Sequence, residues 1–85
     1  MRQAKRQKKQ LILIGKLKEI IKTDGCNYAV IPIRVILNGE KIGSCNAEII
    51  NEQKLRIGES YVFELEQGFV ANEILKGNLT RAKKL

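Results

Sequence analysis

The sequence predicts a small all-β protein in which five strands close into a single barrel. Three observations support this fold class: β-branched apolar residues dominate the stretches between turn signals, Asn38-Gly39 lies between two such stretches, and 85 residues leave room for one core only. Open strand edges promote aggregation, so five strands within residues 11–77 favour closure of the sheet.

The first expected strand covers residues 11–22, in which branched apolar residues surround Gly15. A glycine inside a strand pattern marks a bend, and a bent strand can pair with two different parts of a closed sheet. A helix is the competing interpretation of this segment. Asp24-Gly25 then predicts a turn, because glycine adopts positive φ without strain.

The second and third strands are expected at residues 27–37 and 40–49. Asn38-Gly39 joins them and is the favoured two-residue hairpin turn. Pro32 lacks an N–H group, so its position predicts a sheet edge, a bulge or an interrupted ladder.

The second half of the chain is expected to complete the barrel. Its elements are a connector at residues 50–58, with a short helical turn from Asn51 as one option, a fourth strand at 59–66, a turn at Gln67-Gly68 and a fifth strand at 69–75. Alternation along the fourth strand places Tyr61, Phe63 and Leu65 on one face, which we assign to the core.

The net charge of +7 is concentrated at the two ends of the chain. Residues 1–10 carry five basic residues and no acid, residues 81–85 carry three and no acid, and residues 11–80 carry eight basic and all nine acidic residues. We therefore expect a flexible basic arm at residues 1–10, a nearly neutral barrel at 11–77 and a flexible basic tail at 78–85. Basic arms of this kind commonly attach to nucleic acid, and a merely solubilising terminus is the alternative.

The composition disfavours several classes of function. The chain has no histidine and no glycine-rich phosphate loop, so we do not expect an enzyme. Two cysteines, Cys26 and Cys45, are too few for a zinc site. We expect them to be reduced thiols, with a disulfide between them as the alternative, and we expect no cofactor. The longest apolar runs are too short for a signal peptide or a membrane span, so we expect a cytoplasmic protein that does not enter the membrane.

Three stretches resemble the strands of the OB-fold, the five-stranded oligonucleotide/oligosaccharide-binding barrel of Greek-key topology. They are LILIGKLKEII, NYAVIPIRVILNGEKIGSCNAEII and KLRIGESYVFELEQGFV, and the resemblance covers residues 11–77. LRIGESYVFEL is similar to the lead into the fourth strand of small single-stranded DNA-binding and replication-protein-A-like modules. The resemblance implies a ligand lying across the second and third strands, flanked by the loops between strands one and two and strands four and five. This chain departs from the best-known members in having few aromatic residues and a very short expected loop between strands four and five.

Alternation along the second strand separates core residues from outward residues. The inward set is Ala29, Ile31, Ile33, Val35 and Leu37, and the outward set is Tyr28, Val30, Pro32, Arg34 and Ile36. A tyrosine ring can stack on a base for about 1–3 kcal/mol, and arginine can stack or pair with phosphate. The alternative for both residues is a structural or solvated surface role.

The candidate nucleic-acid-binding residues combine the arm with this outward face. They are Arg2, Lys5, Arg6, Lys8, Lys9, Lys16, Lys18, Tyr28, Arg34, Ser44 and Asn46, with Lys22 and Lys41 as weaker candidates near the hairpin ends. Glu48 shares the face of Ser44 and Asn46, where a carboxylate disfavours dense phosphate contacts.

These observations predict a non-enzymatic protein that binds single-stranded nucleic acid with weak sequence specificity, DNA somewhat in preference to RNA. The alternative is a protein-interaction barrel, an accessory subunit of a replication, primase or translation complex, or a homodimer. The neutral barrel and the outward apolar residues Val30 and Ile36 favour this alternative. Attachment of the arms to structured RNA is a third option.

Overall fold

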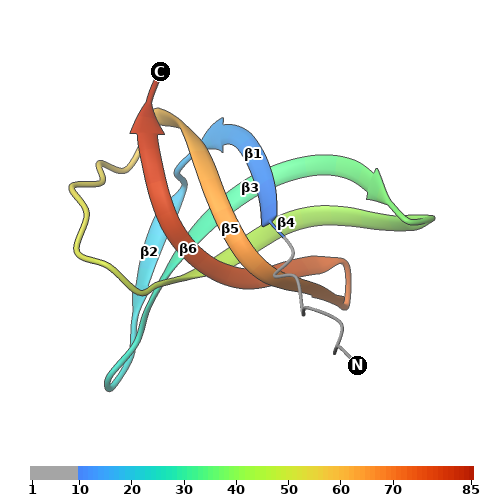
Figure 1. The fold of residues 1–85 in the computed structure, drawn as a ribbon, viewed down its shortest axis with the longest axis horizontal. Coiled ribbons are helices and arrows are strands. Elements are labelled where there is room, and N and C mark those ends of the chain that lie inside the picture. Colours follow the sequence, from blue (N-terminus) through green and yellow to red (C-terminus); the bar gives the residue numbers. More distant parts are fainter. Residues whose placement is uncertain (1–9) are drawn as a thin grey trace, which may run out of the picture.

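The protein is an all-β barrel, as the sequence predicts. The structure, a computed structural model, describes residues 10–85 apart from the side chain of Gln67. Its strands are β1 (Gln10–Lys16), β2 (Glu19–Lys22), β3 (Asn27–Leu37), β4 (Glu40–Ile49), β5 (Ser60–Ala71) and β6 (Ile74–Lys84) (Figure 1). Six strands rather than the expected five form one sheet, because the expected first strand is divided into β1 and β2.

The sheet closes into a barrel between β1 and β2, the two parts of the divided strand. The strand order is β1-β5-β6-β4-β3-β2, so the two ends of the sheet belong to consecutive segments of the chain. Between them, the Leu17 N–H donates to the Glu59 carbonyl and the Lys18 N–H donates to the Val30 carbonyl, each at 2.9 Å. The bend expected in this strand therefore exists, and it lies at Leu17 and Lys18 rather than at Gly15.

Gly15 has a different structural role from the one expected. A Cβ atom at this position would lie 2.9 Å from Cγ2 of Ile31, inside van der Waals contact. The glycine thus permits β1 to approach β3 across the closing seam of the barrel.

The hairpin of β3 and β4 has the predicted boundaries and the predicted turn. Asn38 and Gly39 have φ values of 52° and 82°, as a two-residue hairpin with positive φ at both positions requires. The ladder is interrupted by a bulge between Pro32 and Val35, and β2 pairs only with the first four residues of β3. Pro32 therefore lies at an edge and a bulge, which confirms its interpretation.

Two expectations for the second half of the chain are wrong, and one option left open for the connector is not realised. No turn forms at Gln67-Gly68; β5 continues to Ala71 and turns at Asn72 and Glu73. The expected fifth strand at residues 69–75 is therefore shared between β5 and β6. Residues 50–59 contain no helical turn, and the connector is held by the N–H of Arg56, which donates to the Tyr61 hydroxyl at 2.7 Å.

The expected flexible C-terminal tail at residues 78–85 is also wrong, because β6 runs to Lys84 between β5 and β4. Leu79 is opposite Leu65 in the β5–β6 ladder and Ala82 is opposite Phe63, with Thr80 as an extra residue at a bulge. The bulge spaces the inward residues of this segment three apart instead of two. A search for strict alternation therefore finds no strand in LTRAKKL.

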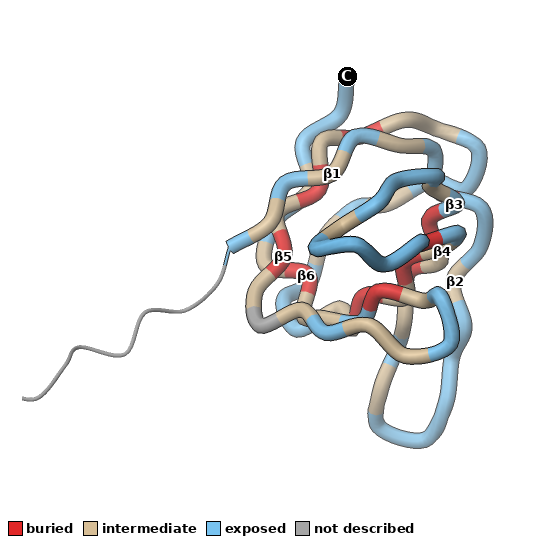
Figure 2. Tube along the Cα trace, turned by 90° about the vertical axis from the view of Figure 1, so that its right-hand side faces the viewer, coloured by how far each residue is buried: buried red, intermediate tan, exposed pale blue. Residues whose placement is uncertain are grey.

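The core consists of apolar side chains from the bend and from four strands, and the buried positions surround the barrel interior (Figure 2). It contains Leu17, Ala29, Ile31, Ile42, Cys45, Ala47, Tyr61, Phe63, Leu65, Leu75 and Leu79. The rings of Tyr61 and Phe63 lie 5.4 Å apart between centroids and tilted, a favourable aromatic geometry. The assignment of both rings to the core is confirmed.

The β5–β6 turn carries backbone strain that a substitution should relieve. Glu73 has a φ of 63°, a left-handed conformation that costs a non-glycine residue about 1 kcal/mol or more. Glu73→Gly is expected to raise the free energy of unfolding by about 1 kcal/mol in urea denaturation. The control is Glu40→Gly in β4, which should lower stability by about 0.5–1 kcal/mol, and a loss of stability in both variants would contradict the assignment of strain.

Candidate nucleic-acid interface

Two rows of side chains cross the outward face of the sheet. Residues that are opposite one another in register point to the same face. Between the two rows lie Ala29 and Ala47, which are buried, and Gly77, which has no side chain. One row is Ile21, Tyr28, Glu48, Asn78 and Glu66, and the other is Glu19, Val30, Asn46, Lys76 and Phe69. The face is therefore built from β2, β3, β4, β6 and β5 in spatial order.

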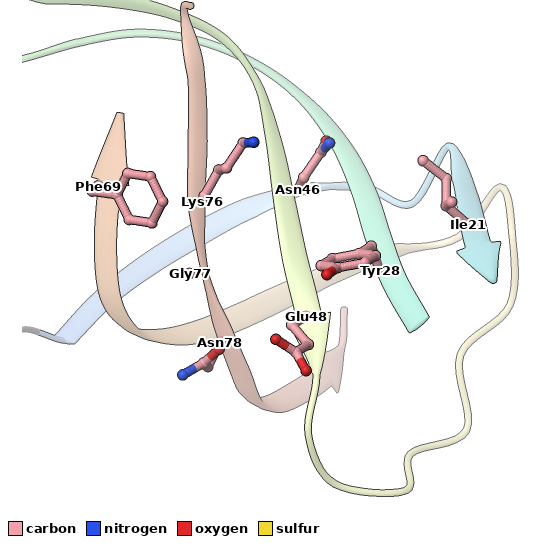
Figure 3. A pocket seen from close by; sticks show the side chains of 8 residues that line it. All are labelled: Ile21, Tyr28, Asn46, Glu48, Phe69, Lys76, Gly77 and Asn78. Carbon is pink, nitrogen blue, oxygen red and sulfur yellow. The ribbon is translucent and has the colours of Figure 1, made fainter. Parts of the chain in front are cut away.

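A hollow of about 440 Å³ lies on this face. Its lining residues are Ile21, Tyr28, Asn46, Glu48, Phe69, Lys76, Gly77 and Asn78, and Figure 3 shows their side chains. The volume is within the usual range of small-ligand sites. The hollow has aromatic residues toward its two sides and polar residues between them.

Phe69 is the most exposed aromatic side chain of the hollow, with 60% of its surface accessible. A bulge between Glu66 and Phe69 determines its orientation. The Cα–Cβ direction at Gly68 points into the core, where a Cβ would lie 2.9 Å from Cδ1 of Leu11, so the next residue, Phe69, faces outward.

Tyr28 and Phe69 are too far apart to hold a single base between them. Tyr28 lies on β3 and Phe69 on β5, with β4 and β6 between them. Three strand spacings amount to about 14 Å, so the two rings would contact different bases of one extended strand.

The polar floor of the hollow contains one cation and one carboxylate. Lys76 is exposed next to Asn46, and Glu48 lies between Tyr28 and Asn78. The Cys26 thiol donates a hydrogen bond to Oε2 of Glu48 at 3.3 Å, and this bond, followed by burial, raises the pKa of Cys26. The negative charge of an ionised Cys26 raises the pKa of Tyr28, with burial adding to the shift, so the phenol stays neutral at neutral pH.

The structure brings together only part of the predicted site. Tyr28 and Asn46 line the hollow, and Ser44 lies in the next row of the same face, opposite Pro32. Arg34 is exposed but borders a different hollow with Ile36 and Lys41, about 20 Å along β3 from Tyr28.

The remaining basic candidates do not line the hollow. Lys16 is the last residue of β1, opposite Ser60, and Lys18 follows it at the bend. Lys22 ends β2 and is exposed. The five basic candidates of the arm, Arg2, Lys5, Arg6, Lys8 and Lys9, lie outside the described residues.

Phe69, Lys76 and Asn78 were not predicted as site residues. The sequence contains no periodic signal for them, because bulges on β5 and β6 change which positions face outward. Only Asn72, a residue type that tolerates positive φ, is a local signal that the chain turns there and that the residues on either side pair.

Both cysteines are free thiols, and burial raises the pKa of Cys45 to about 12. Among residues 10–85, no group of three or more metal-ligating side chains comes together. The same part of the chain has no helix long and apolar enough to span a membrane.

No family model, curated protein or solved structure matches the chain.

Proposed function

We propose that the protein is a non-enzymatic, single-stranded nucleic-acid-binding module that uses the outward face of β3, β4 and β6 together with Phe69. The observation that carries this proposal is the position of Tyr28 and Phe69 at the two sides of one exposed hollow, with Lys76 between them. Aromatic rings stack on any base, at about 1–3 kcal/mol per base, and a lysine attracts phosphate.

The arrangement favours single strands over duplexes. Stacking on Tyr28 or Phe69 needs the flat face of a base, which a duplex hides between neighbouring base pairs. Arg34 and Lys41, exposed toward the end of the β3–β4 hairpin, offer further contacts for the phosphates of a longer strand. Single-stranded DNA is the first ligand to test, RNA is the second, and the basic arm would add affinity that depends on salt.

The test is a fluorescence-polarisation titration of labelled oligothymidine and of a duplex of equal length at several salt concentrations. Tyr28→Ala and Phe69→Ala are each expected to weaken single-strand binding roughly tenfold, and the double variant should approach the product of both effects because the rings act independently. Ile12→Ala, an exposed residue on β1, is the control and should bind normally. Equal affinity for duplex, or binding that ignores both aromatic substitutions, would contradict the proposal.

A second candidate function, protein interaction, is favoured by exposed isoleucines. Ile12 and Ile14 on β1 are 67% and 66% exposed, and Ile36 on β3 is 71% exposed. Such side chains are typical of surfaces that bind another protein or a second copy of the chain. A dimer in light scattering that Ile12→Lys dissociates, together with failure to bind oligonucleotides, would favour this function.

A further inference from the structure

We propose that Glu48, beside Tyr28, forms a position on the outward face that selects guanine. This inference rests on the proposed function and adds to it the identity of one base. Glu48 projects from β4, and its neighbours across the sheet are Tyr28 on β3 and Asn78 on β6 (Figure 3).

A carboxylate at this place is unfavourable for contact with the phosphate backbone. Like charges repel, and the cation of the hollow, Lys76, lies in the neighbouring row rather than opposite Glu48. The phosphates are therefore expected to follow Lys76, and the bases are expected to point toward Glu48. A carboxylate accepts hydrogen bonds only, so it is complementary to a base edge that carries donors.

The Cys26 thiol orients the carboxylate of Glu48, which can still accept further hydrogen bonds. The Cys26 thiol donates to its Oε2 at 3.3 Å. A thiol is a weak donor, and an ionised carboxylate offers about four lone-pair sites. The raised pKa of Cys26 keeps the thiol protonated at neutral pH, so this donor stays in place.

Guanine fits this arrangement better than the other bases. Its Watson–Crick edge places two donors, N1–H and N2–H, side by side, and they match the two oxygens of one carboxylate. Thymine and uracil offer one donor between two carbonyl acceptors, whereas adenine and cytosine offer one amino group beside an acceptor nitrogen. The Asn78 amide, opposite Glu48 on β6, adds a donor suited to the guanine O6.

Tyr28 supplies the surface on which this base would rest. Residues directly opposite in an antiparallel ladder have Cβ atoms about 4.5–5.5 Å apart, and Tyr28 is opposite Glu48. A base stacked on the Tyr28 ring thus has its edge within reach of the carboxylate. Phe69, about 14 Å away, would stack another base of the strand without selecting it.

The experiment compares short strands that differ at one position. Fluorescence polarisation would measure the affinity of the full chain for strands of about eight nucleotides, near the footprint of one OB barrel. One strand is all thymine, and the others carry a single central guanine, hypoxanthine, adenine or cytosine. Guanine is expected to bind roughly tenfold more tightly than thymine, and hypoxanthine, which lacks the N2 amino group, should lose most of this gain.

Two substitutions assign the preference to Glu48. Glu48→Gln should reduce the guanine preference below about twofold, while all-thymine binding tightens slightly because a negative charge is removed. Glu64→Gln removes the same charge from β5 at a residue that does not line the hollow and is opposite Ile12 and Arg81, and it should preserve the preference. Equal binding of all strands, preference for another base, or an unchanged preference in Glu48→Gln would overturn the guanine position alone. Absence of binding to every strand would overturn the single-strand proposal as well.

Discussion

A chain that ends at Gly77 is expected not to fold, although it loses only eight residues. The truncation removes most of β6, which is hydrogen-bonded to β5 on one side and to β4 on the other. It also removes Leu79, which is fully buried, and loss of such a side chain alone costs about 2–5 kcal/mol. Domains of this size have about 5–15 kcal/mol of total stability, so the loss of Leu79, of most of the β5–β6 ladder and of the end of the β4–β6 ladder should exceed what is available. Circular dichroism and dispersion of the amide NMR signals would measure the outcome.

The control for this truncation tests whether folding depends on the positive charge of β6 rather than on the strand itself. Arg81→Gln with Lys83→Gln keeps β6 but removes two exposed cations, and this variant should fold with stability within about 1 kcal/mol of the unmodified chain. The truncated chain would fold normally if the C-terminal segment were only a charged tail. That result would disprove the position of β6 in the sheet.

Phe63→Ala is expected to lower the free energy of unfolding by about 3–5 kcal/mol, the largest effect of any single substitution considered for this barrel. Phe63 is fully buried and is the largest side chain in the core that water does not reach. Its removal leaves a cavity among close-packed neighbours and eliminates the ring contact with Tyr61. The midpoint of urea denaturation measures the loss, and the thermal midpoint should fall by roughly 10 °C or more.

Phe69→Ala is the matched control, because it makes the same chemical change on the same strand at a residue that is 60% exposed. Its stability should change by less than about 0.5 kcal/mol, while its single-strand affinity falls. Comparable destabilisation by both substitutions would show that Phe69 packs into the core and does not present its ring to a ligand.

The turn and the strand boundaries of the β3–β4 hairpin could be predicted because their determinants are local. Asn38-Gly39 adopts positive φ at low cost, so the turn and the pairing of the flanking residues follow from two adjacent residues. Inward residues such as Ala29 and Ile31 then follow from alternation, and both are buried. Tyr28 and Asn46 could therefore be placed on the outward face before the structure was known.

Val35 shows where alternation ceases to be a reliable guide within this hairpin. It was assigned to the core, but it is 42% exposed, whereas its partner across the ladder, Ile42, is buried. The bulge between Pro32 and Val35 intervenes, and β3 continues beyond the barrel toward the turn. A bulge shifts one strand against the other. Whether a residue after the bulge is buried then depends on which other parts of the chain pack against that part of the strand.

Reasoning from the amino-acid sequence was sufficient to predict the all-β class, a bent first strand, the turns at Gly25 and Asn38-Gly39, and the outward positions of Tyr28 and Asn46. These features depend on backbone preferences and on period-two alternation, both of which operate within a few residues. Long-range packing, in contrast, makes residues 78–84 a strand and brings Phe69, Lys76 and Asn78 into the same hollow as Tyr28. The bulges at Gly68 and Thr80 shift the register of β5 and β6, and such a shift is stabilised by core contacts with distant residues such as Leu11 and Leu65.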